Sequence, residues 1–469
     1  MSTTTALVLR EINGPFSLEQ ISLNAIRNNE ALVEIHATGI CHTDLSCANG
    51  TLPASAPAVL GHEGAGVIKE VGADIIDLKP GDKVLLSFAH CGTCEQCTSG
   101  HPAYCYSFVP WNFGGKRPDG SSALNLDGSQ NKKALYSSFF GQSSFARLAI
   151  VHRSSLVKVG DENDLALFAP LGCGLQTGAG AILNTLNVQP GKTVAIFGVG
   201  SVGMSAVMAA KLRGAKEIIA VDLQQSRLDL AKTLGATATI LGSDSDIISK
   251  MQEVSPPNGV NYALDCTGVP AVIETMIKCL GTRGRAASVG APSPGKTVDV
   301  DVFAQLIHGR EYVGCCEGDA VPSKLIPFLI EQHAQGKYPI EELITYYDVK
   351  DFEQAISDTK SGKALKACLK AADPNNFVHL SHNDVDIQDG AVEMRYRTGV
   401  FCEEDLSKVT DIDSDYKKHE FLNLGRPLFP QIWFGLDTSF ALTAYWLFEL
   451  CIWSLIEYSM HHFLFHIEE

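Results

Sequence analysis

The chain has 469 residues, with 37 Lys and Arg against 53 Asp and Glu, and a net charge of −16 at pH 7. This acidic balance argues against a nucleic-acid-binding protein, which needs clustered basic charge. Residues from Pro374 onward contribute −10 of that charge and the preceding residues only −6. The first ten residues lack the long apolar run of a secretory signal. We therefore expect a cytoplasmic protein whose cysteines are reduced.

Residues 1–173 consist of short strand-like runs separated by Gly- and Pro-rich turns, which predicts a mostly β domain. Cys41 follows the alternating run 31–36, His62 stands in Leu60-Gly-His-Glu-Gly, and Cys173 stands in Leu171-Gly-Cys-Gly. Two cysteines and one histidine from separate segments leave one position of a tetrahedral Zn²⁺ open for water or an alcohol oxygen. Each residue alone would more often be structural, but together they predict a catalytic metal site.

A second group of cysteines lies between these ligands. Cys91, Cys94, Cys97 and Cys105 occur within fifteen residues. Four thiolates at this spacing can surround one Zn²⁺ and leave no open position, as in a structural site. The alternatives are a redox pair or ordinary packing thiols, whereas a reducing compartment disfavours a disulfide cluster.

A dinucleotide fingerprint follows. The buried-strand pattern 191–197 leads into Gly198-Val-Gly200-Ser-Val-Gly203 and then into a run of helix formers, 204–212. In this context Gly198 makes the tight turn, Gly200 lets the backbone approach a pyrophosphate, and Gly203 lets the helix pack on the strand. The phosphates would lie at the positive end of the helix.

The next strand pattern, 217–222, ends in Asp222. A carboxylate there accepts hydrogen bonds from the adenosine ribose and repels a 2′-phosphate, so the sequence favours NAD over NADP. Arg227 is either a contact along the adenosine or a solvent-facing helix residue.

Alternating strand and helix patterns continue through 174–313, which predicts a doubly wound parallel sheet. The strand candidates are Ala195–Phe197, Ile218–Val221, Tyr262–Leu264 and Ala286–Val289.

Several of these motifs resemble one family. The signature Gly61-His62-Glu63-x-x-Gly66-x₅-Gly72, the four-cysteine group and Leu171-Gly-Cys173-Gly are similar to those of zinc-dependent medium-chain alcohol dehydrogenases, from about Ala6 to Leu369. The segments 112–121 and 139–145 resemble the aryl-alcohol (benzyl alcohol) dehydrogenase branch. The resemblance implies an α/β protein with a GroES-like catalytic zinc domain (1–173 and 314–372) and an NAD-binding Rossmann domain (174–313). It also implies a homo-oligomer, a dimer or a tetramer.

Further residues have candidate roles. The resemblance places Lys366 near the pyrophosphate and His42 at another phosphate contact. The other roles follow from side-chain chemistry: Thr43 would pass the alcohol proton outward, because its hydroxyl both donates and accepts, with a helix-capping threonine as the alternative. Glu63 would be a tuning neighbour of the metal or a transient ligand, and Asp44 a partner that sets the tautomer of His62. Many family members carry a histidine five residues after the first zinc cysteine, where this chain has Ser46.

The extension 373–469 differs in composition from the rest of the chain. Acidic residues dominate 384–420, and apolar and aromatic residues follow, interrupted by Glu449 and Glu457. Residues 453–466 resemble the first histidine box of membrane fatty acid 2-hydroxylases, with His461 and His466 as the matching histidines. The later boxes are absent, so we interpret the extension as a truncated hydroxylase-like fragment, with membrane association through 432–466 as the functional alternative.

The leading hypothesis is a zinc- and NAD-dependent dehydrogenase that interconverts a small primary, aromatic alcohol and its aldehyde. Within the same family, the alternatives are a glutathione-adduct formaldehyde dehydrogenase and a secondary-alcohol or polyol enzyme. A membrane-associated fusion protein with lipid chemistry in the extension, and a zinc protein without activity, are alternatives of other classes.

Overall fold

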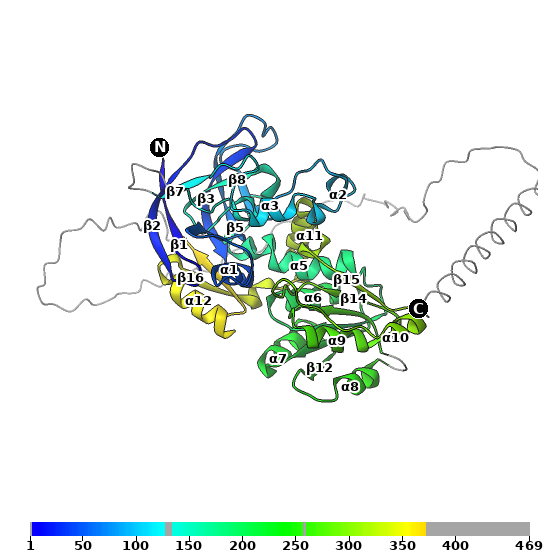
Figure 1. The fold of residues 1–469 in the computed structure, drawn as a ribbon. Coiled ribbons are helices and arrows are strands. Elements are labelled where there is room, and N and C mark those ends of the chain that lie inside the picture. The colour runs from blue at the N-terminus through cyan, green and yellow to red at the C-terminus, as the bar shows by residue number, and fades with distance from the viewer. Residues whose placement is uncertain (1, 127–133, 256, 258, 372–469) are drawn as a thin grey trace, which may run out of the picture. The chain divides into compact units, whose positions relative to one another are not determined.

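The computed structural model describes residues 2–126, 134–255, 257 and 259–371 (Figure 1). Every prediction for the extension 373–469 lies outside these residues. Within them, three sheets and the helices around them form the predicted α/β architecture. No single helix in the described part of the chain has the length and apolar composition to cross a membrane, although the bent pair Leu165–Gly172 and Gly174–Thr185 passes such a test when taken together.

The N-terminal part is built from two sheets. A four-stranded sheet has the order β4-β1-β2-β7, with the strands β1 (Thr3–Leu9), β2 (Phe16–Leu23), β4 (Ala58–Val59) and β7 (Leu124–Leu126). A seven-stranded sheet has the order β16-β17-β3-β5-β6-β9, and β8 also pairs with β3. Its strands are β3 (Glu30–Gly39), β5 (Gly64–Val71), β6 (Lys83–Leu86), β8 (Leu148–His152), β9 (Leu156–Lys158), β16 (Ile344–Asp348) and β17 (Lys366–Lys370). The last two strands come from the C-terminal side of the chain, so residues beyond 314 return to the first sheet system.

The third sheet is parallel throughout and has the order β12-β11-β10-β13-β14-β15. Its strands are β10 (Thr193–Phe197), β11 (Glu217–Asp222), β12 (Ala238–Leu241), β13 (Val260–Asp265), β14 (Leu280–Ser288) and β15 (Glu311–Gly314). The predicted parallel sheet is confirmed, with β12 and β15 as additional strands and with β13 and β14 beginning earlier than predicted. Val289 lies just beyond β14 rather than within it. The domain boundaries near 173 and 313 remain our proposal.

Helices cover both faces of this sheet because residues along its central strand alternate between them. Val194 and Ile196 of β10 pack with α6 and α7 on one face, whereas Ala195 and Phe197 pack with α8 and α9 on the other. Helices α5, α6 and α11 lie between the parallel sheet and the β-rich part (Figure 1). The helices are α1 (His42–Ala48), α2 (Glu95–Thr98), α3 (Phe108–Phe113), α4 (Leu165–Phe168), α5 (Gly174–Gly180), α6 (Ser201–Leu212), α7 (Gln225–Leu234), α8 (Ile247–Val254), α9 (Pro270–Lys278), α10 (Val302–His308), α11 (Pro322–Ala334) and α12 (Phe352–Ser361).

Candidate functional site

Three segments that are far apart in the sequence meet at one point. Cys41 caps the N-terminus of α1 directly after β3, His62 precedes β5, and Cys173 lies between α4 and α5. Their ligand atoms, together with a carboxylate oxygen of Glu63, all lie within 4.8 Å of one another. The structure therefore brings together the three residues that the sequence nominated for a catalytic metal.

The polar atoms at this point fit a metal ion. His62 is fully buried, and its Nε2 has no hydrogen-bond partner among the described residues. Its Nδ1 lies 2.9 Å from Oδ1 of Asp44, which assigns the proton to Nδ1 and leaves the lone pair of Nε2 free. Two thiols and a free imidazole nitrogen suit Zn²⁺, and a carboxylate on the far ring nitrogen is its usual support.

Asp44 organises the segment around both ligands. One carboxylate oxygen accepts hydrogen bonds from Nδ1 of His62 and the backbone N–H of Gly61, and the other accepts one from the backbone N–H of Cys41. Burial opposes charge on the imidazole, but the adjacent Asp44 charge raises the pKa of His62 above its ordinary value. The thiols of Cys41 and Cys173 must lose their protons when a metal ion binds, so uptake of the metal depends on pH.

Aromatic rings enclose His62. The ring of Phe140 stacks on the imidazole at a centroid distance of 4.5 Å, and that of Phe139 meets it edge-on at 5.4 Å. Gln142 donates hydrogen bonds from its amide to the carbonyl oxygens of His62 and Ser87. Phe139, Phe140 and Gln142 belong to the segment 139–145, which resembles the aryl-alcohol branch and for which the sequence predicted no role. This segment holds the ligand in place.

Glu63 and Lys366 form a buried ion pair. Nζ of Lys366 donates to both carboxylate oxygens of Glu63, at 2.8 and 3.0 Å, and the side chains are 2% and 0% exposed. Burial raises the pKa of Glu63. Burial acts in the opposite sense on Lys366, but the Glu63 charge holds the pKa of the ammonium above its ordinary value. Lys366, expected near a pyrophosphate, thus lies against the neighbour of a metal ligand.

The remaining nominated residues of this segment lie on α1. The hydroxyl of Thr43 is 3.7 Å from Sγ of Cys41. The helix cap is Cys41 rather than Thr43, so the capping interpretation of Thr43 is wrong. His42 is exposed at the start of the helix, and Ser46 lies one turn further along.

The four-cysteine lobe also has the geometry of a metal site. Sulfur–sulfur distances are 3.9 Å for Cys91–Cys97, 3.5 Å for Cys94–Cys97 and 3.9 Å for Cys94–Cys105. Four sulfurs placed 2.3 Å from a tetrahedral Zn²⁺ would be about 3.8 Å apart. The lobe therefore fits a closed structural site, with no position left for a substrate.

The glycine fingerprint connects β10 to α6. Gly198 has φ +84°, which favours glycine, and a Cβ on Gly203 would lie 2.1 Å from the carbonyl oxygen of Gly198. A Cβ on Gly200 would meet no protein atom within 4 Å, so open space lies beside the start of α6. This is the arrangement that a pyrophosphate requires.

Asp222 ends β11 beside this turn. Its carboxylate accepts hydrogen bonds from the backbone N–H groups of Val199 and Gln224, at 2.8 and 2.9 Å. Nη1 of Arg227 lies 3.8 Å from the same carboxylate, so Arg227 faces the site rather than solvent.

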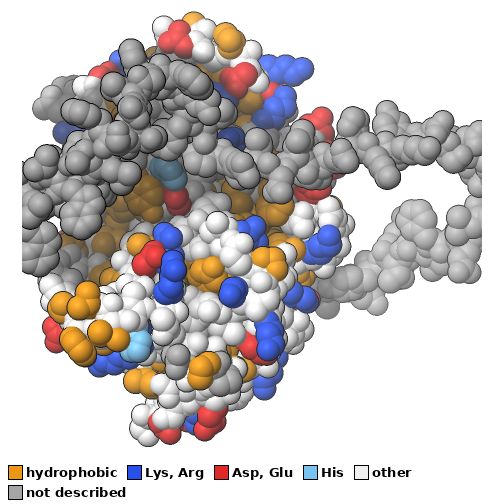
Figure 2. Space-filling model, turned by 90° about the vertical axis from the view of Figure 1, so that its right-hand side faces the viewer, with side chains coloured by type: hydrophobic (Ala, Val, Ile, Leu, Met, Phe, Trp, Pro, Cys, Tyr) orange, Lys and Arg blue, Asp and Glu red, His pale blue; other side chains and the backbone are white. Residues whose placement is uncertain are grey.

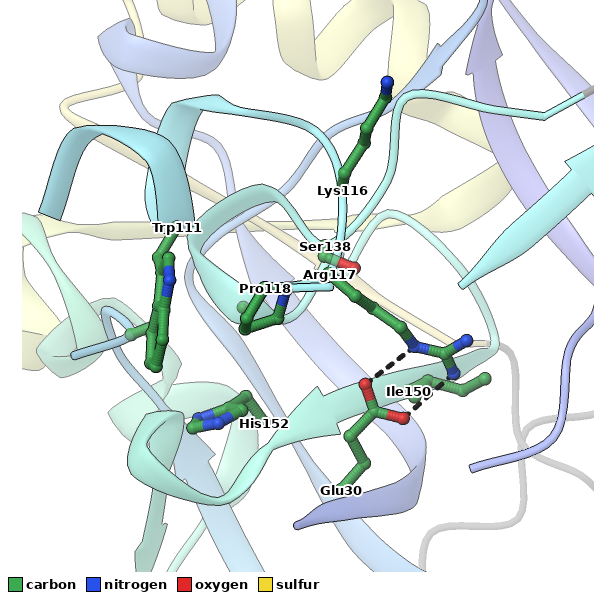
Figure 3. Close-up of a pocket in the computed structure, with 10 residues that line it drawn as sticks. Glu30, Trp111, Lys116, Arg117, Pro118, Ser138, Ile150 and His152 are labelled. Carbon is green, nitrogen blue, oxygen red and sulfur yellow. Dashed lines mark hydrogen bonds and ion pairs between the residues drawn. The ribbon is translucent and has the colours of Figure 1, made fainter. Parts of the chain in front are cut away.

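A small cavity of about 10 Å³ lies apart from these sites (Figure 3). It is bordered by the buried pair Arg117–Glu30, whose two nitrogen–oxygen contacts measure 2.7 and 2.9 Å. Arg117 belongs to the other segment that resembles the aryl-alcohol branch, residues 112–121. Its contacts indicate a structural role for that part of the motif.

The carboxylate of Glu317 contacts one member of the metal-ligand cluster, Cys173. Its Oε1 lies 3.7 Å from Sγ of Cys173, and burial raises the pKa of the carboxyl to about 7. Sequence reasoning did not nominate this residue, because it lies in a loop and far from every motif.

Comparisons with known proteins agree with this geometry. Residues 27–161 match the family described as "Alcohol dehydrogenase GroES-like domain", and residues 201–331 match "Zinc-binding dehydrogenase". A geraniol dehydrogenase from Castellaniella defragrans is 40% identical over 366 residues, which are 78% of this chain and 96% of that protein. An S-(hydroxymethyl)glutathione dehydrogenase from Saccharomyces cerevisiae is 34% identical over 375 residues, with coverage of 78% and 96%.

Among solved structures, a benzyl alcohol dehydrogenase from Acinetobacter calcoaceticus superposes with a TM-score of 0.76 at 40% identity. The match covers 79% of this chain and 100% of that one. Fold, site chemistry and these relatives lead to one conclusion: the chain belongs to the zinc-dependent medium-chain alcohol dehydrogenases, oxidoreductases that act on alcohol donors.

Proposed function

We propose that this protein catalyses the reversible, NAD-dependent oxidation of a small primary alcohol with an aromatic or other unsaturated group to the aldehyde. The convergence of Cys41, His62 and Cys173, with a free lone pair on Nε2 of His62, carries the proposal. Two relatives at 40% identity, one named for geraniol and one for benzyl alcohol, support the substrate class.

In the proposed site, Cys41, His62 and Cys173 would hold the catalytic Zn²⁺, and the four-cysteine lobe would hold a structural one. The catalytic ion would supply Lewis acidity that makes the alcohol easier to deprotonate. Asp44 keeps Nδ1 of His62 protonated, so that Nε2 is available as a ligand. Lys366 balances the charge of the buried Glu63 carboxylate.

Proton transfer falls to Thr43 in this proposal. A hydroxyl can accept one proton and donate another, and Thr43 lies beside Cys41 on the first turn of α1. Ser46 replaces the histidine that many relatives carry at the outer end of this path, so we expect the path to end at the nicotinamide ribose and water.

NAD would accept the hydride at its nicotinamide ring. Gly198, Gly200 and Gly203 would receive its pyrophosphate, and Asp222 would bind the adenosine ribose. Arg227, which lies against Asp222, would border the adenosine, and His42 and Lys366 remain proposed phosphate contacts.

We also propose that the protein is a homo-oligomer. Large apolar side chains are exposed on and beside α10, next to the edge strand β15, namely Val300, Val302, Phe303, Leu306 and Ile307. Figure 2 views the molecule from the side on which α10 lies in Figure 1, and hydrophobic side chains gather at the lower left of this view. An apolar group of this size on a single chain is typical of an interface.

The test is NADH formation by the full-length, zinc-loaded protein with benzyl alcohol, geraniol, ethanol and S-hydroxymethylglutathione. Highest kcat/KM with benzyl alcohol or geraniol supports the proposal. Preference for S-hydroxymethylglutathione would assign the protein to its other relatives. No turnover with any alcohol, at full zinc and NAD occupancy, would refute the proposed reaction.

A further inference from the structure

A second acid reaches the candidate metal centre from a segment that no motif includes. Glu317 lies in the short loop after β15, 144 residues beyond Cys173. Its Oε1 is 3.7 Å from Sγ of Cys173, and its Oε2 is 3.5 Å from Nε2 of Gln176. Like Cys41, Glu317 is only partly buried, whereas His62, Glu63 and Cys173 are buried.

The two acids of the centre differ in their partners. Glu63 has both oxygens engaged by Lys366, and Oε1 also accepts from the backbone N–H of Gly174. Among the described residues, no Lys, Arg or His nitrogen lies within 4.0 Å of the Glu317 carboxylate. A carboxylate that protein largely surrounds is costly without a balancing charge. A cation held at Cys173 would provide that charge.

The backbone at Glu317 is strained. Glu317, Gly318 and Asp319 have φ values of 47°, 71° and 46°, and the left-handed region is unfavourable for the two non-glycine residues. The conformation is imposed from α5: a Cβ on Gly318 would lie 2.6 Å from the carbonyl oxygen of Gln176. Nδ2 of Asn184 donates to the carbonyl oxygens of Gly318 and Asp319, both at 3.1 Å. Strain retained by surrounding contacts is a feature of functional sites.

The cysteine lobe supports the same loop. Nδ1 of His101 lies 2.8 Å from Oδ1 of Asp319. The hydroxyl of Tyr104 donates to the carbonyl oxygen of Gly314 at 3.3 Å and lies 3.4 Å from the backbone N–H of Cys316. His101 and Tyr104 stand between Cys97 and Cys105 in the sequence, so a folded lobe keeps the loop in place.

The distance between Glu317 and Cys173 fits a shared ion. A thiolate sulfur and a carboxylate oxygen on one tetrahedral Zn²⁺ would be about 3.5 Å apart. We propose that Glu317 is an exchangeable fourth ligand of the catalytic metal, in the position that the alcohol takes over, and that the cysteine lobe positions it. This inference rests on the proposed metal centre at Cys41, His62 and Cys173.

The test compares the variants Glu317→Gln and Glu311→Gln in the full-length protein. Glu311 is the matched control, because it loses the same charge from an exposed site on β15, near Arg285. We expect Glu317→Gln to weaken Zn²⁺ binding at the catalytic centre about 10- to 100-fold, as measured by competition with a chelator. The visible spectrum of the Co²⁺-loaded centre should change in Glu317→Gln and remain that of the wild type in Glu311→Gln.

Wild-type Zn²⁺ affinity and an unchanged Co²⁺ spectrum in Glu317→Gln would overturn the inference. If that variant does not fold, a crystal structure of the zinc-loaded wild type without alcohol decides: a bond of about 2.0–2.2 Å from zinc to Oε1 supports the proposal, and an oxygen outside the coordination sphere overturns it. The zinc content separates the two proposals. If the wild type binds zinc only in the cysteine lobe, the proposed catalytic centre is refuted. If the wild type binds both zinc ions and Glu317→Gln keeps the wild-type Zn²⁺ affinity and Co²⁺ spectrum, only this inference is refuted.

Discussion

Replacement of Lys366 by methionine should destabilise the protein strongly, because it leaves the Glu63 carboxylate buried without its cation. The two side chains are 2% and 0% exposed, and both carboxylate oxygens depend on the ammonium group. After the substitution, the backbone N–H of Gly174 is the one remaining donor to the Glu63 carboxylate among the described residues. Removal of one partner from a buried ion pair costs about 3–5 kcal/mol.

The assay is urea unfolding of the zinc-loaded full-length protein, followed by circular dichroism. The double variant Lys366→Met/Glu63→Gln removes both charges and should recover most of the lost free energy of unfolding. Lys363→Met is the control, since Lys363 is 72% exposed and its partner Asp358 keeps hydrogen bonds from Tyr347 and Gln354. Loss of such a solvent-exposed cation should cost about 0–1 kcal/mol.

A loss below about 1 kcal/mol in Lys366→Met would refute this reasoning, because it would mean that water or another group already balances Glu63. The same variant tests the role that the sequence assigned to Lys366. An increased KM for NAD without a change in the free energy of unfolding would favour the pyrophosphate contact over the ion pair.

Three further predictions have defined outcomes. Thr43→Val, which removes only the hydroxyl, should lower kcat about 10²-fold or more, whereas a comparable loss in Ser46→Ala would contradict a proton path that runs from Thr43 to the nicotinamide ribose and water without Ser46. Asp222→Ser should lower the ratio of kcat/KM for NAD to that for NADP about 10-fold or more, because it removes an acceptor and a charge that repels the 2′-phosphate; an unchanged ratio would exclude the ribose contact. Burial lowers the pKa of His152 to about 4. The unfolded chain therefore binds a proton below about pH 6.5 that the folded protein does not. Stability should decrease by up to about 3 kcal/mol as the pH falls from 6.5 to 4. His152→Gln should flatten this dependence in urea unfolding at a series of pH values, and an unchanged slope would assign it to other groups.

Local patterns in the sequence determined the parts of the protein whose residues are close together along the chain. The four cysteines of the lobe lie within one segment of fifteen residues, so their spacing alone brings their sulfurs together. The glycine fingerprint is equally local, because its three glycines act within one strand–turn–helix unit between β10 and α6. The alternation of strand and helix patterns predicted the parallel sheet for the same reason.

Only the tertiary structure decided which distant groups meet. Lys366 and Glu63 are 303 residues apart, and they pair because β17 returns to lie beside β3 in the seven-stranded sheet. Glu317 reaches Cys173 because α5 and the cysteine lobe hold its loop in a strained conformation. Neither contact leaves a periodic or spaced pattern in the sequence, since each depends on how sheets and helices pack rather than on the propensity of one segment.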